Sequence, residues 1–185
     1  AGARVADIRF KFDEERTAEA MIYLAERISS PTIMAIAKLL YFVDKTSLEK
    51  FGRSLTGDAY FAMQHGPVPS NAYDMLKAAR DSDVYGFVVE ANNVITLRQP
   101  NLDKLSISDR ICLDQIIAIY GHFPVWQLRE LSHDEAWKKT WKSAGTSKSV
   151  PIPIAEIVAM LDDEEAIMEY IQETHKPLRD VQGSR

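Results

Sequence analysis

The segment from Pro31 to Lys50 carries the strongest helical signal in the chain. Its apolar residues recur with a period close to 3.6, which places them along one side of an α-helix. Ser30 and Pro31 are suited to the N-cap and the first helical position, and Gly52 is a typical C-terminal stop. Because this is the most apolar of the predicted helices, other elements must cover it. The sequence therefore predicts a central helix over this segment.

Further helical patterns lie on both sides of this segment. Each has an apolar stripe, and most begin or end at residues that cap helices. We predict these helices over residues 14–29, about 69–81, 108–120, 125–131, 135–143 and about 154–173. The intervening residues 145–153 have the composition of a loop.

Two segments favour β-structure instead. The run from Ala59 to Met63 predicts a short strand, followed by a rigid turn at Gly66-Pro67-Val68-Pro69. Residues 84–98 alternate with period two around Asn92-Asn93, which is typical of a β-hairpin. The predicted fold class is therefore α+β and mainly α-helical, a helical bundle with a small antiparallel β-sheet or hairpin.

The length of 185 residues suits one domain. We assign residues 14–176 to a single domain with a motif core at 31–143, preceded by an N-terminal extension at 1–13 and followed by a flexible tail at 177–185. The charged N-terminus does not resemble a signal peptide, and no run of 18 apolar residues predicts a membrane span. A single cysteine is typical of a reducing compartment. These features predict a cytoplasmic protein.

The charge balance bears on the partner. The chain has 22 Lys and Arg against 27 Asp and Glu, a net charge of −5. Proteins that bind the phosphate backbone usually carry a basic excess, so the charge argues against nucleic acid as the main partner.

The sequence lacks the residue spacing that a catalytic or metal site needs. Cys112 lies in a helical pattern between two apolar residues, which is typical of a core residue. The four histidines show neither His-x-x-x-His nor His-Glu-x-x-His spacing, and the glycines form no phosphate-binding loop. We therefore expect no enzyme activity, no cofactor and no metal.

Two aspartates and a histidine are candidates for specific roles. Asp44 lies at the edge of an apolar stripe, so we expect its carboxylate to bond a neighbouring turn or a basic group. Asp58 follows Gly57 and is placed to bond loop amides. His65 precedes the Gly-Pro turn, where it could hold a surface or shape a corner of the core.

His133 and Trp137 are four residues apart and would share one helical face if their segment is continuous. We predict that Trp137 is a packing residue that docks the C-terminal helices against the central helix 31–50.

Four short motifs resemble those of one known family. They are Leu39-Leu40-Tyr41-Phe42, then Thr56-Gly57-Asp58 with Tyr60 and Ala62, then Gly66-Pro67-Val68-Pro69 with Tyr73, and Leu131-Ser132-His133 with Trp137. Their order and spacing resemble the Panacea domain of the SocA-like antitoxin family. The resemblance covers roughly residues 14–143 and departs from the family pattern at His65, where many members carry an aromatic residue.

The resemblance implies a mostly helical antitoxin of a bacterial or phage toxin–antitoxin pair. Such a protein binds a companion toxin and neutralises it, by direct inhibition or by delivering it to a cytoplasmic protease, and it needs no cofactor. The family pairs one scaffold with unrelated toxins. The candidate partner-binding or motif residues are Tyr41, Asp44, Asp58, His65, Gly66, Pro67, Pro69, Tyr73, His133 and Trp137.

Two other functions remain open from the sequence. Helices beside a β-hairpin are also the parts of a winged-helix transcriptional regulator, although no helix rich in Arg and Lys accompanies them. An enzyme that uses Asp44, Asp58, His65 and His133 is the third possibility.

Overall fold

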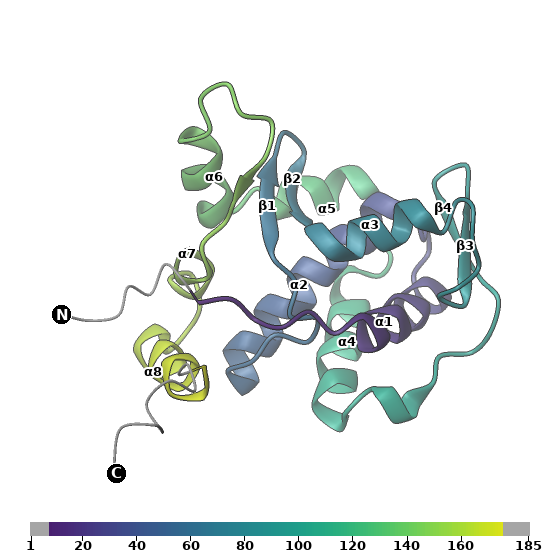
Figure 1. Cartoon of the computed structure of the whole chain (residues 1–185), viewed down its shortest axis with the longest axis horizontal. Coiled ribbons are helices and arrows are strands. Elements are labelled where there is room, and N and C mark those ends of the chain that lie inside the picture. Colours follow the sequence, from purple (N-terminus) through teal and green to yellow (C-terminus); the bar gives the residue numbers. More distant parts are fainter. Residues whose placement is uncertain (1–7, 176–185) are drawn as a thin grey trace, which may run out of the picture.

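Helix α2 (Ile33–Phe51) runs through the middle of the computed structural model, which describes residues 8–175 (Figure 1). Most of its side chains are buried, and Ile36, Leu39, Leu40 and Tyr41 are fully so. It packs against α1 (Glu14–Arg27), α4 (Ile107–Tyr120), α5 (Val125–Ser132) and the sheet. The predicted central position of this helix is confirmed.

The ends of α2 differ in how well the sequence predicted them. Gly52 adopts the left-handed conformation, with φ of 69°, and caps the C-terminus as expected. The N-cap is Thr32 and not Ser30, because the Thr32 side chain accepts a hydrogen bond from the Ala35 amide at 3.1 Å. Pro31 stays outside the helix, where its carbonyl accepts a hydrogen bond from Val94.

Helices α1 and α4 also begin at capping side chains. Asp13 caps α1, and its side chain accepts a hydrogen bond from the Arg16 amide. Ser106 caps α4 in a reciprocal pair with Asp109, so the sequence-based choice of Ser108 was wrong by two residues. The short 3₁₀ helix η2 (Leu102–Lys104) precedes α4.

The larger sheet has three strands in the order β2-β1-β5. The predicted strand is β1 (Tyr60–Met63), and the expected rigid turn is instead a second strand, β2 (Gly66–Pro69), paired antiparallel with β1. Pro67 and Pro69 are tolerated because β2 is an edge strand, where a missing amide costs little. The predicted loop at 145–153 contains β5 (Val150–Pro151), which pairs with the other side of β1.

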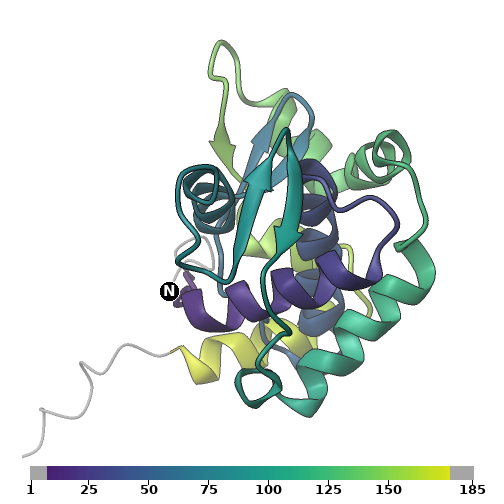
Figure 2. The same cartoon turned by 90° about the vertical axis from the view of Figure 1, so that its right-hand side faces the viewer.

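The second sheet is the predicted hairpin, formed by β3 (Phe87–Glu90) and β4 (Asn93–Thr96). Its two turn residues are Ala91 and Asn92, both with positive φ, so the turn lies one residue earlier than expected. The hairpin packs against α1 and α3 (Ser70–Ala78), as Figure 2 shows. The mainly helical α+β fold class is confirmed.

The C-terminal part of the chain departs from the predicted single helix. After α6 (Glu135–Lys142) it forms α7 (Ile154–Val158) and α8 (Glu164–Thr174), separated by a bend. Asp163 takes a left-handed conformation in this bend, with φ of 58°, which Asp tolerates better than most residues. The bend lets Ile157 and Ile171, on different helices, both reach the core.

The described part of the N-terminal extension is not separate from the core. Ile8, Phe10 and Phe12 pack against core residues, and the Asp13 amide donates to the Thr56 carbonyl at 2.9 Å. The predicted flexible tail, residues 177–185, lies outside the described residues.

This close contact at the N-terminus yields a test of the fold. Gly57 has φ of +71°, and a Cβ there would lie 2.0 Å from the Lys11 carbonyl oxygen. Gly57→Ala therefore combines left-handed strain with a backbone clash, and we expect it to lower the free energy of unfolding by more than about 3 kcal/mol. Gly145 has φ of +59° with nothing within 4 Å of its Cβ position.

Gly145→Ala is the matched control and should cost only about 1 kcal/mol, the conformational term alone. Urea denaturation of both variants measures the difference. Equal losses would show that the contact with Lys11 does not constrain the loop.

Candidate functional site

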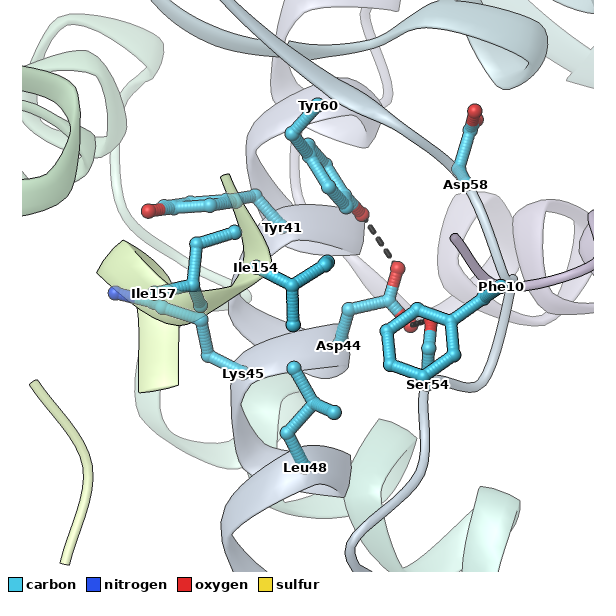
Figure 3. Close-up of a pocket in the computed structure, with 10 residues that line it drawn as sticks. All are labelled: Phe10, Tyr41, Asp44, Lys45, Leu48, Ser54, Asp58, Tyr60, Ile154 and Ile157. Atoms are coloured by element: carbon cyan, nitrogen blue, oxygen red, sulfur yellow. Dashed lines mark hydrogen bonds between the residues drawn. The ribbon is translucent and has the colours of Figure 1, made fainter. Parts of the chain in front are cut away.

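Asp44 is the most densely bonded side chain near the middle of the fold. It is 3% exposed, and its Oδ1 accepts hydrogen bonds from Ser54 Oγ, the Leu55 amide and the Thr56 amide. Its Oδ2 accepts from the hydroxyls of Thr56 and Tyr60. Figure 3 shows Asp44 reaching from α2 toward Ser54 and Tyr60. The expectation that Asp44 bonds a neighbouring turn is confirmed.

The environment of Asp44 does not resemble a substrate site. Burial raises the pKa of its carboxyl, while hydrogen bonds from Thr56 and Tyr60 oppose that shift. The adjoining cavity has a volume of only about 10 Å³, close to the minimum for one water molecule. The carboxylate therefore joins α2, the loop after it and β1.

Tyr41 and its neighbours extend this polar centre to α6. The Tyr41 hydroxyl donates to Asp134 Oδ2 at 2.6 Å, and Lys45 Nζ lies 3.1 Å from the same oxygen. The other Asp134 oxygen accepts from the Trp137 amide and caps α6. The Tyr41 ring packs edge-on against the Tyr60 ring.

Asp58 caps helix α3 from outside it. Its carboxylate accepts hydrogen bonds from the amides of Ala59, Asn71 and Ala72, and from the Asn71 side chain. This compensates for Pro69, which occupies the N-cap position of α3 without a side-chain hydrogen bond. The prediction that Asp58 bonds loop amides is confirmed for Ala59, whereas the Asn71 and Ala72 amides belong to the first turn of α3.

Lys38 is a buried residue that the sequence reasoning missed. Its side chain is fully buried, and Nζ donates to the Pro67 carbonyl at 3.1 Å. Burial and the positive charge of Arg129 lower its pKa to about 7. A lysine within the most apolar predicted helix was the available signal, since such a side chain must find a partner.

Gly66 is required beside this lysine. A Cβ at Gly66 would lie 2.7 Å from Lys38 Nζ and 2.6 Å from Ser132 Oγ, and φ is +112°. Strand β2, α2 and the C-terminal end of α5 therefore pack tightly against one another around Gly66.

His133 and Trp137 lie against this junction. Their rings stack with centroids 4.0 Å apart and an angle of 10° between the planes. They do not belong to one continuous helix, because His133 ends α5 and Asp134 starts α6. Trp137 Nε1 donates to the Met63 carbonyl at 2.8 Å. Trp137 therefore docks α6 on strand β1 through this hydrogen bond, a contact that the prediction of docking on the central helix did not include.

The Nε2 atom of His133 is buried and has no hydrogen-bond partner within residues 8–175. Burial lowers the pKa of this histidine, and the nearby His65 backbone acts in the opposite direction. The neutral ring suits its stacking position against an indole.

The structure separates the predicted site residues into two groups. The larger group is internal or part of the scaffold: Tyr41, Asp44, Asp58, Gly66, Pro67, Pro69, His133 and Trp137. His65 and Tyr73 instead line a surface groove of about 540 Å³ between the β1–β2 turn, α2, α3 and α6. Met34, Met63 and Trp141 lie in the same groove, although sequence reasoning assigned them no role.

Other chemistry finds little support in these residues. Burial raises the pKa of the Cys112 thiol to about 11, so its nucleophilic thiolate is disfavoured. Within residues 8–175, no three His, Cys, Asp or Glu side chains lie close enough together to hold a metal ion. No helix in that range has both the length and the apolar character needed to cross a bilayer.

The structure is thus a mainly helical scaffold with internal motif residues and a surface groove lined mostly by apolar side chains. A model of the Panacea domain of the SocA-like antitoxins matches residues 36–138, from α2 into α6. This is more than half of the chain, and the chain belongs to this family, as the motifs predicted. Searches of curated proteins and of solved structures found no match.

The buried lysine predicts a specific pH dependence. Unfolded Lys38 titrates near 10.5, whereas the folded pKa is about 7, so the unfolded state binds more protons between these values. Stability should therefore rise with pH across this window, by about 1.5 kcal/mol from pH 7 to 8.5. Lys38→Met should lack this increment, because the variant has no titrating group there.

Urea denaturation of both proteins at pH 7 and pH 8.5 measures the difference, and the other titrating groups cancel between them. If both proteins respond equally to pH, Lys38 retains an ordinary pKa in the folded state.

Trp137 predicts a contrast between two tryptophans. Trp137 is 9% exposed and Trp126, on α5, is 65% exposed. Trp137→Ala should cost about 3–5 kcal/mol of stability, the usual range for a buried large aromatic residue. Trp126→Ala should stay within about 0.5 kcal/mol of the parent. A Trp137→Ala protein that melts like the parent but no longer binds a partner would place Trp137 on the recognition surface.

Proposed function

We propose that this protein is an antitoxin that binds a companion toxin encoded beside it in the genome and neutralises it in the cytoplasm. The match to the SocA-like antitoxin family over residues 36–138 is the observation that carries the proposal. The protein acts by binding and needs neither a catalytic residue nor a cofactor. We also propose that residues 14–176 work as one domain.

The arrangement of the motif residues supports a division of labour. Asp44, Asp58 and Gly66 hold elements of the scaffold together, so they explain a common fold and not the choice of partner. Recognition then falls to surface side chains, which can change without affecting those contacts. Such a scaffold can serve different toxins.

We favour neutralisation by a direct complex. The second route within this proposal is an adaptor role, in which the bound toxin is delivered to a cytoplasmic protease. Both routes require the same first step, a stable contact between the two proteins.

The winged-helix alternative has less physical support. Arg98, next to the β3–β4 hairpin, donates twice to the Glu19 carboxylate, at 2.6 and 2.9 Å. A cation committed in this way is a poor phosphate ligand. The net charge of −5 also argues against binding to the phosphate backbone of DNA.

Co-expression tests the proposal. The product of the neighbouring gene should stop growth when expressed alone, and this chain should restore growth when expressed with it. The two proteins should also co-purify. An unrelated soluble protein expressed at the same level is the control and should give no rescue.

Loss of rescue in hosts without individual cytoplasmic proteases, with a longer toxin lifetime, would favour the adaptor route. A harmless neighbouring gene product, or rescue without a complex, would contradict direct binding.

A further inference from the structure

The apolar groove beside α6 is the feature of the surface that best fits a partner. It lies where α6 and the β1–β2 hairpin stand next to each other (Figure 1), and its volume is about 540 Å³. Its sides come from elements far apart in sequence, including Met34 on α2, Tyr73 on α3 and Trp141 on α6. A concave, mostly apolar site of this size is typical of a binding pocket.

The lining of the groove is suited to apolar side chains of varied shape. Met34 and Met63 are partly exposed, and their flexible thioethers adapt to different contact surfaces. The rings of Tyr73 and Trp141 provide large apolar faces. Trp141 stacks against Trp137, with centroids 6.1 Å apart, and Trp137 is itself held by the Met63 carbonyl. The aromatic wall is therefore preorganised.

The charge at the rim indicates what should flank the apolar segment. Lys148 lines the groove. It is exposed, and within residues 8–175 it forms no ion pair. By contrast, Lys138 and Lys139 on α6 pair with Glu135 and Glu156. An unpaired ammonium group on the lining of an apolar groove favours a carboxylate on the partner.

From this geometry we infer that the groove receives a short apolar segment of the companion toxin, with an acidic residue beside it that pairs with Lys148. This inference rests on the proposed function, since it names the surface and the chemistry of that contact. The described ends of this chain do not line the groove, because Phe10 packs against His175 and neither residue is among its lining residues.

Site-specific photo-crosslinking locates the contact in the intact complex of the two full-length proteins. A benzophenone amino acid placed at position 65 or 148 should crosslink to the toxin, and one placed at position 126 on α5 should not. Mass spectrometry of the crosslinked toxin peptide should find an apolar run with an Asp or Glu beside it. Crosslinking only from position 126, or a basic or polar peptide, would overturn the inference.

Binding measurements with matched variants test the energetics. Met63→Glu and Trp141→Ala should each weaken toxin binding roughly tenfold or more, as expected for anchors in a groove, whereas Trp126→Ala should not. Melting curves identify any variant that fails to fold. For such a position, the crosslinking experiment tests whether the groove contacts the toxin. Folded groove variants that bind as tightly as the parent would contradict the inference.

Charge reversal tests the rim separately. Lys148→Glu should slow association and reduce its salt dependence, because a complementary pair becomes a repulsive one. Lys138→Glu on α6 is the matched control, since it changes the net charge equally. Equal effects of the two substitutions would remove the acidic partner residue from the proposal.

The failure of the inference differs from that of the proposed function. If the parent protein neither binds the toxin nor rescues growth, the antitoxin proposal fails. If the parent binds and rescues while the groove variants do the same, only the groove assignment fails.

Discussion

The position of the larger sheet depends on one buried carboxylate. An ionised aspartate inside a protein is costly unless hydrogen bonds replace its lost hydration. Asp44 accepts five such bonds, from Ser54, Leu55, Thr56 and Tyr60. Because these donors lie in the loop after α2 and at the start of β1, satisfying the charge fixes where the chain re-enters the core. Strand β1 then carries β2 on one side and β5 on the other. The β1–β2 hairpin, the hydrogen bond from Trp137 to Met63 and the groove all depend on where β1 lies.

A second constraint explains why the Gly-Pro motif is internal. The Lys38 ammonium group reaches the Pro67 carbonyl only because Gly66 has no side chain in the space between α2, β2 and α5. Any Cβ at that position would collide with Lys38 or Ser132. Residues of this kind belong to the scaffold, because they hold α2, β2 and α5 together. They do not by themselves mark the surface that a partner touches.

The sequence was informative where a local signal decides the structure. Helix α2 has a strong apolar period and a glycine stop, and Asp44 is a lone carboxylate beside an apolar stripe that requires donors. The sequence was misleading where contacts between distant parts of the chain determine the local structure. Pro67 suggested a turn, but the edge of a sheet accepts a proline strand. The pattern at 154–173 is helical throughout, yet packing of two apolar patches around the core bends the chain at Asp163. The groove was not predictable, because its lining residues extend from Met34 to Lys148 along the sequence and only the fold brings them together.

Because the polar centre and the groove are separate, substitutions in one need not affect the other. The side chains of Asp44, Asp58 and Lys38 form hydrogen bonds inside the fold, so substitutions at these positions lower stability directly. The groove residues His65 and Lys148 are exposed, and replacement of their side chains should cost little folding free energy. Trp137 lies between the two regions, since it is anchored to β1 and also supports the Trp141 wall of the groove. A change at Trp137 would therefore alter both the stability of the fold and the shape of the groove, whereas changes at the rim can alter the proposed partner contact while the fold is kept.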